Sequence, residues 1–148
     1  MNLTVYLSGE IHSDWREQIA SGIAEHKLPV VILTPVTTHS ASDNVGVEIL
    51  GAEEKAFWKD HKAAKINSIR IKNAIEKADV VVVRFGDQYK QWNAAFEAGY
   101  AVAKGKQLIT LHSEDLRHAL KEVDASAVAT AETPQQVVKI LKYVTTQA

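Results

Sequence analysis

The stretch Ala78-Asp-Val-Val-Val-Val83 decides the fold, because consecutive valines between polar segments are typical of a strand buried on both faces. Residues 66–77, directly before it, carry apolar side chains at helical spacing. A helix that runs straight into such a strand is typical of an α/β domain. We therefore predict that residues 78–83 form the central strand of a parallel sheet.

Working outward, further apolar runs predict four more strands, and helical spacing predicts the segments between them. The strands are expected at residues 3–8, 29–34 and 106–111, with a weaker one at 125–129. Helices are expected at residues 15–26 with Ser13 as N-cap, at 93–104, at 113–122, and after Pro134. Residues 35–64, which include Trp58, lack a clean pattern and are expected to form a functional loop, a lid or small elements.

Strands that alternate with helices at this spacing predict right-handed crossovers and a doubly wound, five-stranded parallel sheet. We expect a three-layer, flavodoxin-like or Rossmann-like sandwich with strand order 2-1-3-4-5. No repeat or linker interrupts the pattern, so residues 1–148 are predicted to form a single domain. In such sheets ligands bind at the carboxyl ends of the strands, where the strand order reverses.

The composition is that of an ordinary globular protein, with 46% apolar and 24% charged residues. Seventeen Lys and Arg against 18 Asp and Glu give no basic excess, which argues against a nucleic-acid polymer as partner. The absence of cysteine excludes disulfides and thiolate chemistry. The first apolar run is too short for a signal peptide or a membrane span, so no membrane association and a cytoplasmic location are expected.

Two loops should flank the ligand crevice, residues 9–16 after the first strand and residues 84–93 after the third. Carboxylates, amides and aromatic faces gather in them, and these groups together suit a nucleoside or nucleotide. The first loop carries Gly9, Glu10, His12 and Asp14, and the second carries Arg84, Asp87, Tyr89, Trp92 and Asn93.

On the helix after the second loop, small residues form a face that can pack closely on the sheet, and Glu97 lies at its edge, one turn from Asn93. The nearby helix N-terminus favours the ionised carboxylate by roughly 0.3–1 kcal/mol. An ionised carboxylate held beside a sugar can attack the anomeric carbon. The alternative is a solvated surface glutamate. Likewise, Asp87 fits an ordinary turn, and His12 and Asp14 fit capping or surface roles.

No pattern in the chain predicts a metal or a cofactor. The six histidines show no H-E-x-x-H spacing, and there is neither a G-x-G-x-x-G fingerprint nor a phosphate-binding loop. A receiver-type signalling domain would need paired aspartates at the ends of the first and third strands, which end instead in Ser8-Gly9-Glu10 and Arg84-Phe85.

Three stretches together resemble the nucleoside 2-deoxyribosyltransferase family: Tyr6-Leu-Ser-Gly9, Ala78-Asp-Val-Val-Val, and Ala94-Ala-Phe-Glu-Ala-Gly-Tyr-Ala-Val-Ala-Lys-Gly-Lys106. Residues 9–16, 42–51, 57–61 and 91–96 resemble more narrowly its YtoQ-type branch. The resemblance implies that a carboxylate nucleophile breaks an N-glycosidic bond and forms a deoxyribosyl-enzyme, which a second base or water resolves. It places Glu97 at the nucleophile position. It also implies a homo-oligomer, a dimer or larger, because the family builds its sites at subunit interfaces.

The chain departs from the family at two expected aspartates, where it has Gln91 and Ile71. Gln91 cannot act as an acid or base, so Asp87, Glu10 or Asp14 is expected to protonate the departing base. Gly9, His12 and Asn93 are expected to line the pocket, with Trp92 and Trp58 stacking on the base. Two hypotheses stay open: a nucleoside or nucleotide N-glycosidase or transferase, and a non-catalytic module that binds a nucleotide-derived ligand.

Overall fold

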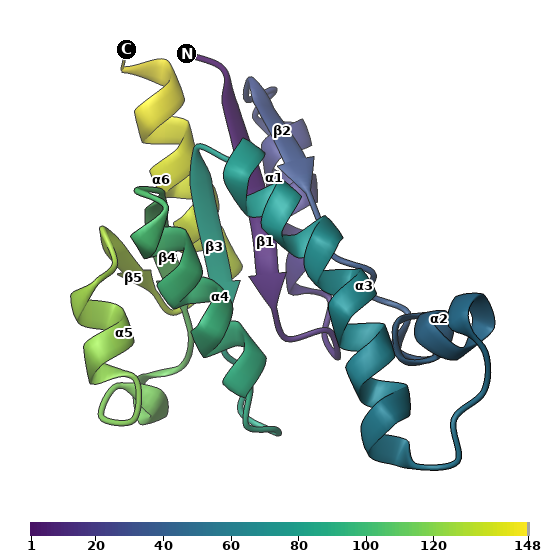
Figure 1. The fold of residues 1–148 in the computed structure, drawn as a ribbon. Coiled ribbons are helices and arrows are strands. Elements are labelled where there is room, and N and C mark those ends of the chain that lie inside the picture. The colour runs from purple at the N-terminus through teal and green to yellow at the C-terminus, as the bar shows by residue number, and fades with distance from the viewer. Residues whose placement is uncertain (148) are drawn as a thin grey trace.

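The computed structural model describes residues 1–147, and it contains one sheet of five parallel strands in the order β2-β1-β3-β4-β5 (Figure 1). This confirms the predicted order 2-1-3-4-5. The central strand β3 lies between β1 and β4. Its Val83 is beside Ser8 of β1 on one side and Thr110 of β4 on the other. The strands are β1 (Leu3–Gly9), β2 (Val30–Leu33), β3 (Val80–Arg84), β4 (Gln107–Leu111) and β5 (Ala129–Ala131).

Helices cover both faces of the sheet, because alternate strand residues are apolar on each side. Val80 and Val82 of β3 join the core under α1 and α6, whereas Val81 and Val83 join the core under α3 and α4. All four valines are buried, as expected for a central strand. The covering helices are α1 (Trp15–Glu25), α6 (Pro134–Thr146), α3 (Ala56–Lys77) and α4 (Trp92–Ala103).

Most of residues 35–64 lie in helices, α2 (His39–Leu50) and the first part of α3, which agrees with the alternative that this segment carries small elements of its own. The two helices pack on each other, and a Cβ at Gly46 would lie 2.5 Å from that of Lys62, so only glycine permits this close crossing. The pair, which we call the α2–α3 hairpin (residues 39–77), extends past the end of the sheet (Figure 1). Phe57 and Trp58 are exposed at its outer end.

The region after β4 differs from the prediction. Residues 113–120 form a short 3₁₀ helix (Glu114–Leu116) and turns, and α5 (Lys121–Ala125) follows, so that its last residue overlaps the expected fifth strand. β5 begins only at Ala129, because the preceding residues are rich in alanine and serine, which favour strands weakly. The helix expected after Pro134 is confirmed, and Thr133 and Gln136 form its capping box.

The start of α1 also differs from the prediction. Asp14, not Ser13, is its N-cap residue. The Ser13 hydroxyl lies one residue before the cap and donates to the Glu10 carboxylate at 2.6 Å. Among residues 1–147, no helix combines the length and hydropathy needed to cross a bilayer.

Candidate functional site

The site is built where the end of β1 meets α4. Strand alternation turns Tyr6 and Ser8 toward the α3 and α4 side of the sheet. Ala94, Ala98 and Ala101 are buried and let α4 lie close to the strands. Glu97 lies at the partly buried edge of this face of α4, and its Oε2 accepts a hydrogen bond from the fully buried Ser8 hydroxyl. The fold thus holds one glutamate carboxylate against the end of the central strands.

Two opposing effects set the ionisation of Glu97. Burial raises the pKa of its carboxyl, and this outweighs the Ser8 hydrogen bond and the positive charge of Arg16, which lower it. Arg16 is itself buried, and it donates to the backbone oxygens of Leu7, Gly9 and Glu10 at 3.0, 3.1 and 2.7 Å. Arg16 therefore fixes the strand end and supplies a permanent positive charge.

Tyr6 adds a hydroxyl to the same side of the sheet. It is completely buried, and its hydroxyl has no hydrogen-bond partner within residues 1–147. Burial, followed by the negative charge of Glu97, raises the pKa of Tyr6 above its ordinary value. Tyr6 therefore stays protonated, with a donor that is not yet used.

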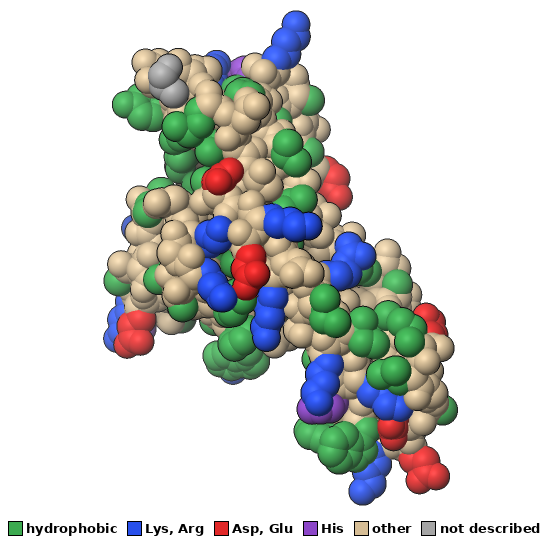
Figure 2. All heavy atoms as spheres, turned by 45° about the horizontal axis from the view of Figure 1, so that its top comes forward, with side chains coloured by type: hydrophobic (Ala, Val, Ile, Leu, Met, Phe, Trp, Pro, Cys, Tyr) green, Lys and Arg blue, Asp and Glu red, His purple; other side chains and the backbone are tan. Residues whose placement is uncertain are grey.

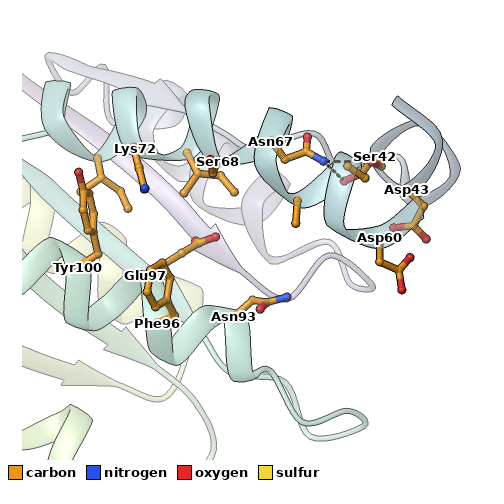
Figure 3. A pocket seen from close by; sticks show the side chains of 14 residues that line it. Ser42, Asp43, Asp60, Asn67, Ser68, Lys72, Asn93, Phe96, Glu97 and Tyr100 are labelled. Atoms are coloured by element: carbon orange, nitrogen blue, oxygen red, sulfur yellow. Dashed lines mark hydrogen bonds between the residues drawn. The ribbon is translucent and has the colours of Figure 1, made fainter. Parts of the chain in front are cut away.

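Glu97 opens into a cavity of about 570 Å³ between α4 and the α2–α3 hairpin (Figure 3). This volume is in the range of small-molecule sites. Asn67 of α3 donates to the backbone oxygen and hydroxyl of Ser42 at 3.0 and 3.1 Å, which joins the two helices of the hairpin at the cavity wall. The polar and aromatic lining residues are Ser42, Asp43, Asp60, Asn67, Ser68, Lys72, Asn93, Phe96, Glu97 and Tyr100.

A second, smaller cavity of about 190 Å³ lies between the β1–α1 loop and the β3–α4 loop. Glu10, His12 and Asp87 line it, together with Arg84 and Gln91. The Asp87 carboxylate accepts a hydrogen bond from Ser113 at 2.6 Å. The structure therefore brings Glu10, His12 and Asp87 together, but in a cavity separate from the lining of the Glu97 cavity.

The other predicted site residues occupy varied positions. Asn93 lines the Glu97 cavity. Gly9 ends β1 and binds Arg16 through its carbonyl. Asp14 occupies the N-cap position of α1 without a side-chain capping hydrogen bond, and its carboxylate accepts from the Gln18 side chain at 2.8 Å. Trp92 is 73% exposed under the Lys90 ammonium, and Trp58 packs on Phe57 and His61 at the end of the hairpin. Neither tryptophan is among the residues that line the Glu97 cavity.

Sequence reasoning missed several residues around Glu97. Ser8 was recognised only as part of a motif, although the period-two alternation of its strand already placed it on the same face as Tyr6. Asp43 and Asp60 come from the segment that showed no pattern, so no signal assigned them to the site. Asn67 lies in the helix predicted over residues 66–77, but nothing in the sequence brought that helix to the site. Within residues 1–147, His, Asp and Glu side chains do not form a cluster of three or more that could hold a metal ion.

Comparison with known proteins agrees with this architecture. A family model described as nucleoside 2-deoxyribosyltransferase YtoQ matches residues 6–145. The chain belongs to this family. An uncharacterised protein of Bacillus subtilis strain 168, YtoQ, is 48% identical over 143 residues, which cover 97% of each chain.

Two solved structures share the fold at low sequence identity. A conserved protein from Enterococcus faecalis V583 has a TM-score of 0.67 at 12% identity, over 97% of this chain and 99% of that one. A 2-deoxyribosyltransferase from Bacillus psychrosaccharolyticus has a TM-score of 0.55 at 15% identity, over 91% of this chain and 90% of that one. The fold is therefore that of nucleoside deoxyribosyltransferases.

Replacing Ser8 with alanine should raise the pKa of Glu97 further, because the hydrogen bond that favours the ionised form is lost. We expect a loss of roughly 1–3 kcal/mol in the free energy of unfolding where Glu97 is ionised, and a smaller loss at acid pH. Urea denaturation across pH measures this.

The matched control is Thr110→Val. It removes a buried hydroxyl that donates to Thr130 and that lies on the same row of the sheet as Ser8. A pH-independent loss in Ser8→Ala, like that of the control, would contradict the assignment.

Proposed function

We propose that this protein cleaves the N-glycosidic bond of a 2-deoxyribonucleoside or its nucleotide, with Glu97 as the nucleophile. The observation that carries the proposal is the Glu97 carboxylate, held by Ser8 at the end of β1 and open to a cavity of ligand size. Family membership and the shared deoxyribosyltransferase fold support it.

The contacts of Glu97 suggest a division of work between its two oxygens. Ser8 holds Oε2, which leaves Oε1 to attack the anomeric carbon. The bond from that carbon to the base nitrogen breaks, and its electron pair leaves with the base, which takes a proton from a nearby acid. Water or a second base then attacks the glycosyl ester and releases Glu97. The first route is hydrolysis and the second is transfer.

The proton donor is best sought among carboxyls of the same cavity. Asp43 and Asp60 both line it, and Asp43 already pairs with His39 at 3.0 Å. Asp60 is exposed and forms no ion pair within residues 1–147, so we propose it as the donor. The expectation that Asp87 or Glu10 plays this part stays a prediction, which Asp87→Asn and Glu10→Gln test in the same assay.

Asp60→Asn should lower the rate of base release by roughly 10²- to 10⁴-fold, the usual contribution of a general acid. Chromatography of the free base under single-turnover conditions measures the rate. Asp43→Asn and Asp87→Asn are the matched controls, since each removes one carboxyl from the first or the second cavity. A large loss in Asp87→Asn with a normal Asp60→Asn would return the role to Asp87.

The decisive experiment incubates the wild type with 2′-deoxynucleosides and their 5′-monophosphates, with and without a second free base. Release of base supports hydrolysis, and exchange of bases supports transfer. A second candidate is a binding module without turnover, favoured because Ile71, at one expected aspartate position, gives the Glu97 cavity an apolar wall. Thermal stabilisation by a panel member without any base release would select the binding module.

We also infer that the protein forms a homo-oligomer. Hydrophobic side chains gather over the outer end of the α2–α3 hairpin (Figure 2), where Phe57 is 66% exposed, and Phe96 at the edge of the Glu97 cavity is 67% exposed. Exposed apolar side chains in a group are typical of interfaces. Light scattering after gel filtration measures the oligomeric state, and a monomer at micromolar concentration would contradict the inference.

A further inference from the structure

His112, which directly follows β4, is a buried imidazole that is not among the residues lining either cavity. It is 1% exposed. Its Nδ1 lies 2.7 Å from the backbone oxygen of Ser113, and its Nε2 lies 2.9 and 2.8 Å from the two carboxylate oxygens of Asp124 on α5. A carbonyl and a carboxylate only accept hydrogen bonds, so the imidazolium, with two N–H groups, is the form that can donate to both.

Loss of one ring proton disrupts this arrangement. A neutral imidazole has one N–H and one lone pair. The lone pair would face either the Ser113 carbonyl or the Asp124 carboxylate, and a buried acceptor without a donor is unfavourable. The two hydrogen bonds of His112 are therefore linked to the uptake of a proton, and imidazole is the side chain that ordinarily changes its charge between about pH 5 and 8.

The pair of His112 and Asp124 joins α5 to the end of β4, at the β5 edge of the sheet (Figure 1). No residue of α5 is fully buried, and Val123 is only partly buried against the core. Glu132, which follows β5, is paired with Arg117. Asp124 is therefore the charged group that faces His112 from α5, while the nearby charge beyond β5 is already neutralised.

The turn that His112 holds also contacts the β3–α4 loop, residues 85–91. Ser113 Oγ donates to the Asp87 carboxylate at 2.6 Å, and Asp87 lines the smaller cavity. Phe85, at the start of the loop, meets the His112 ring edge to face, with the ring centroids 6.4 Å apart. A continuous set of contacts therefore runs from α5 through His112 and Ser113 to the loop that forms one side of the smaller cavity.

We propose that the pair of His112 and Asp124 is a proton-operated latch. When the ring carries two protons, the latch holds α5 and the turn at Ser113, and the turn holds the β3–α4 loop beside the smaller cavity. Loss of one ring proton releases one of the two bonds and loosens the loop. The latch acts on the shape of a cavity, so it does not depend on which reaction the protein catalyses.

The first test uses the wild type alone at about pH 5.5 and about pH 9, on either side of the ordinary range of imidazole. NMR of the His112 ring nitrogens should show two protons at the lower pH and one at the higher. Amide hydrogen exchange of residues 85–91, corrected for the intrinsic effect of pH, should be roughly two- to tenfold faster at the higher pH, the effect of one lost hydrogen bond. Equal corrected exchange, or an unchanged number of ring protons, overturns the proposal.

The second test replaces the carboxylate with an amide of the same shape. In Asp124→Asn the amide can donate to Nε2 while Nδ1–H still donates to Ser113, so a neutral ring keeps both bonds. We expect Asp124→Asn to keep the loop protected at both pH values and to abolish the pH difference. A pH difference as large as that of the wild type overturns the proposal, and this comparison stands even if His112→Gln, which removes the titrating ring, fails to fold.

Two other histidines provide matched controls. His118 is exposed in the same segment, and the His12 ring lies 4.8 Å from that of Tyr89, which belongs to the same loop. His118→Gln and His12→Gln should both keep the pH difference of the wild type. If either control abolishes it, the titrating group is not His112 and the latch is overturned.

Discussion

Glu97→Ala is expected to lower base release from 2′-deoxynucleosides by at least about 10³-fold, because it removes the atom that forms the glycosyl-enzyme. The remaining cavity still offers Asn93 and the hairpin residues, so ligand binding should persist. Single-turnover base release measures the first effect and calorimetry the second. Retention of the wild-type rate by Glu97→Ala would eliminate it as the nucleophile.

Glu97→Gln is the matched variant, since it keeps the shape and loses the charge. Because burial raises the pKa of Glu97, folding favours its protonated form. The resulting gain in the free energy of unfolding is complete below the ordinary carboxyl pKa and is lost as pH rises through the raised pKa. Glu97→Gln should therefore be inactive but relatively more stable than the wild type at neutral pH than at acid pH. Urea denaturation at both pH values measures this. If Glu97→Gln lost more stability relative to the wild type at neutral pH than at acid pH, the unfavourable burial of the Glu97 charge would be contradicted.

Gly9→Ala is expected to destabilise the fold by at least about 3 kcal/mol. Gly9 ends β1 with φ at +106°, and a Cβ there would lie 2.2 Å from the carbonyl oxygen of Arg84 on β3. That oxygen accepts the Glu10 N–H, so the clash falls on the strand pair that carries the site. Chemical denaturation measures the loss, and circular dichroism shows whether the variant still folds.

Two other glycines provide graded controls. Gly105 also has a positive φ, at +71°, but a Cβ there meets nothing within 4 Å, so alanine should cost roughly 1 kcal/mol from backbone strain alone. Gly99 lies inside α4 with open space around it, and alanine there should stabilise the helix by roughly 0.5–1 kcal/mol. If Gly9→Ala costs no more than Gly105→Ala, the close approach to Arg84 is not limiting.

The strand order could be predicted because apolar side chains cover both faces of the central strands, as the run from Val80 to Val83 shows most clearly. The α2–α3 hairpin could not, since α2 and the first part of α3 pack mainly on each other and bury few residues, such as Gly46 and Ala63. Without a continuous apolar stripe there is no period to detect. The fifth strand, predicted over residues 125–129, lies at Ala129–Ala131, because a three-residue edge strand leaves almost no signal beside a short helix.

In the candidate site, too, the sequence predicts the positions of residues on their elements but not the contacts that depend on how the elements pack. Glu97 and Asn93 follow from the position of α4 after the central strand, and the structure places both in one cavity. The contact between Ser8 and Glu97 joins residues 89 positions apart, and only the packing of α4 on β1 creates it. Glu10 and Asp87 were grouped with Glu97 because their loops follow neighbouring strands. Strand ends alone do not distinguish two adjacent cavities.

The α2–α3 hairpin forms one wall of the Glu97 cavity, and this wall is anchored to the core at one end only. α3 is anchored to the core near Ile75, whereas Asp60 lies about 22 Å further along its axis, at 1.5 Å per residue. A rotation of α3 by about 10° around the anchored end would move Asp60 by roughly 4 Å and leave Lys72 almost in place. The distance between Asp60 and Glu97 therefore depends on the angle of α3, because Glu97 lies on a different helix, α4, and is hydrogen-bonded to Ser8 of β1.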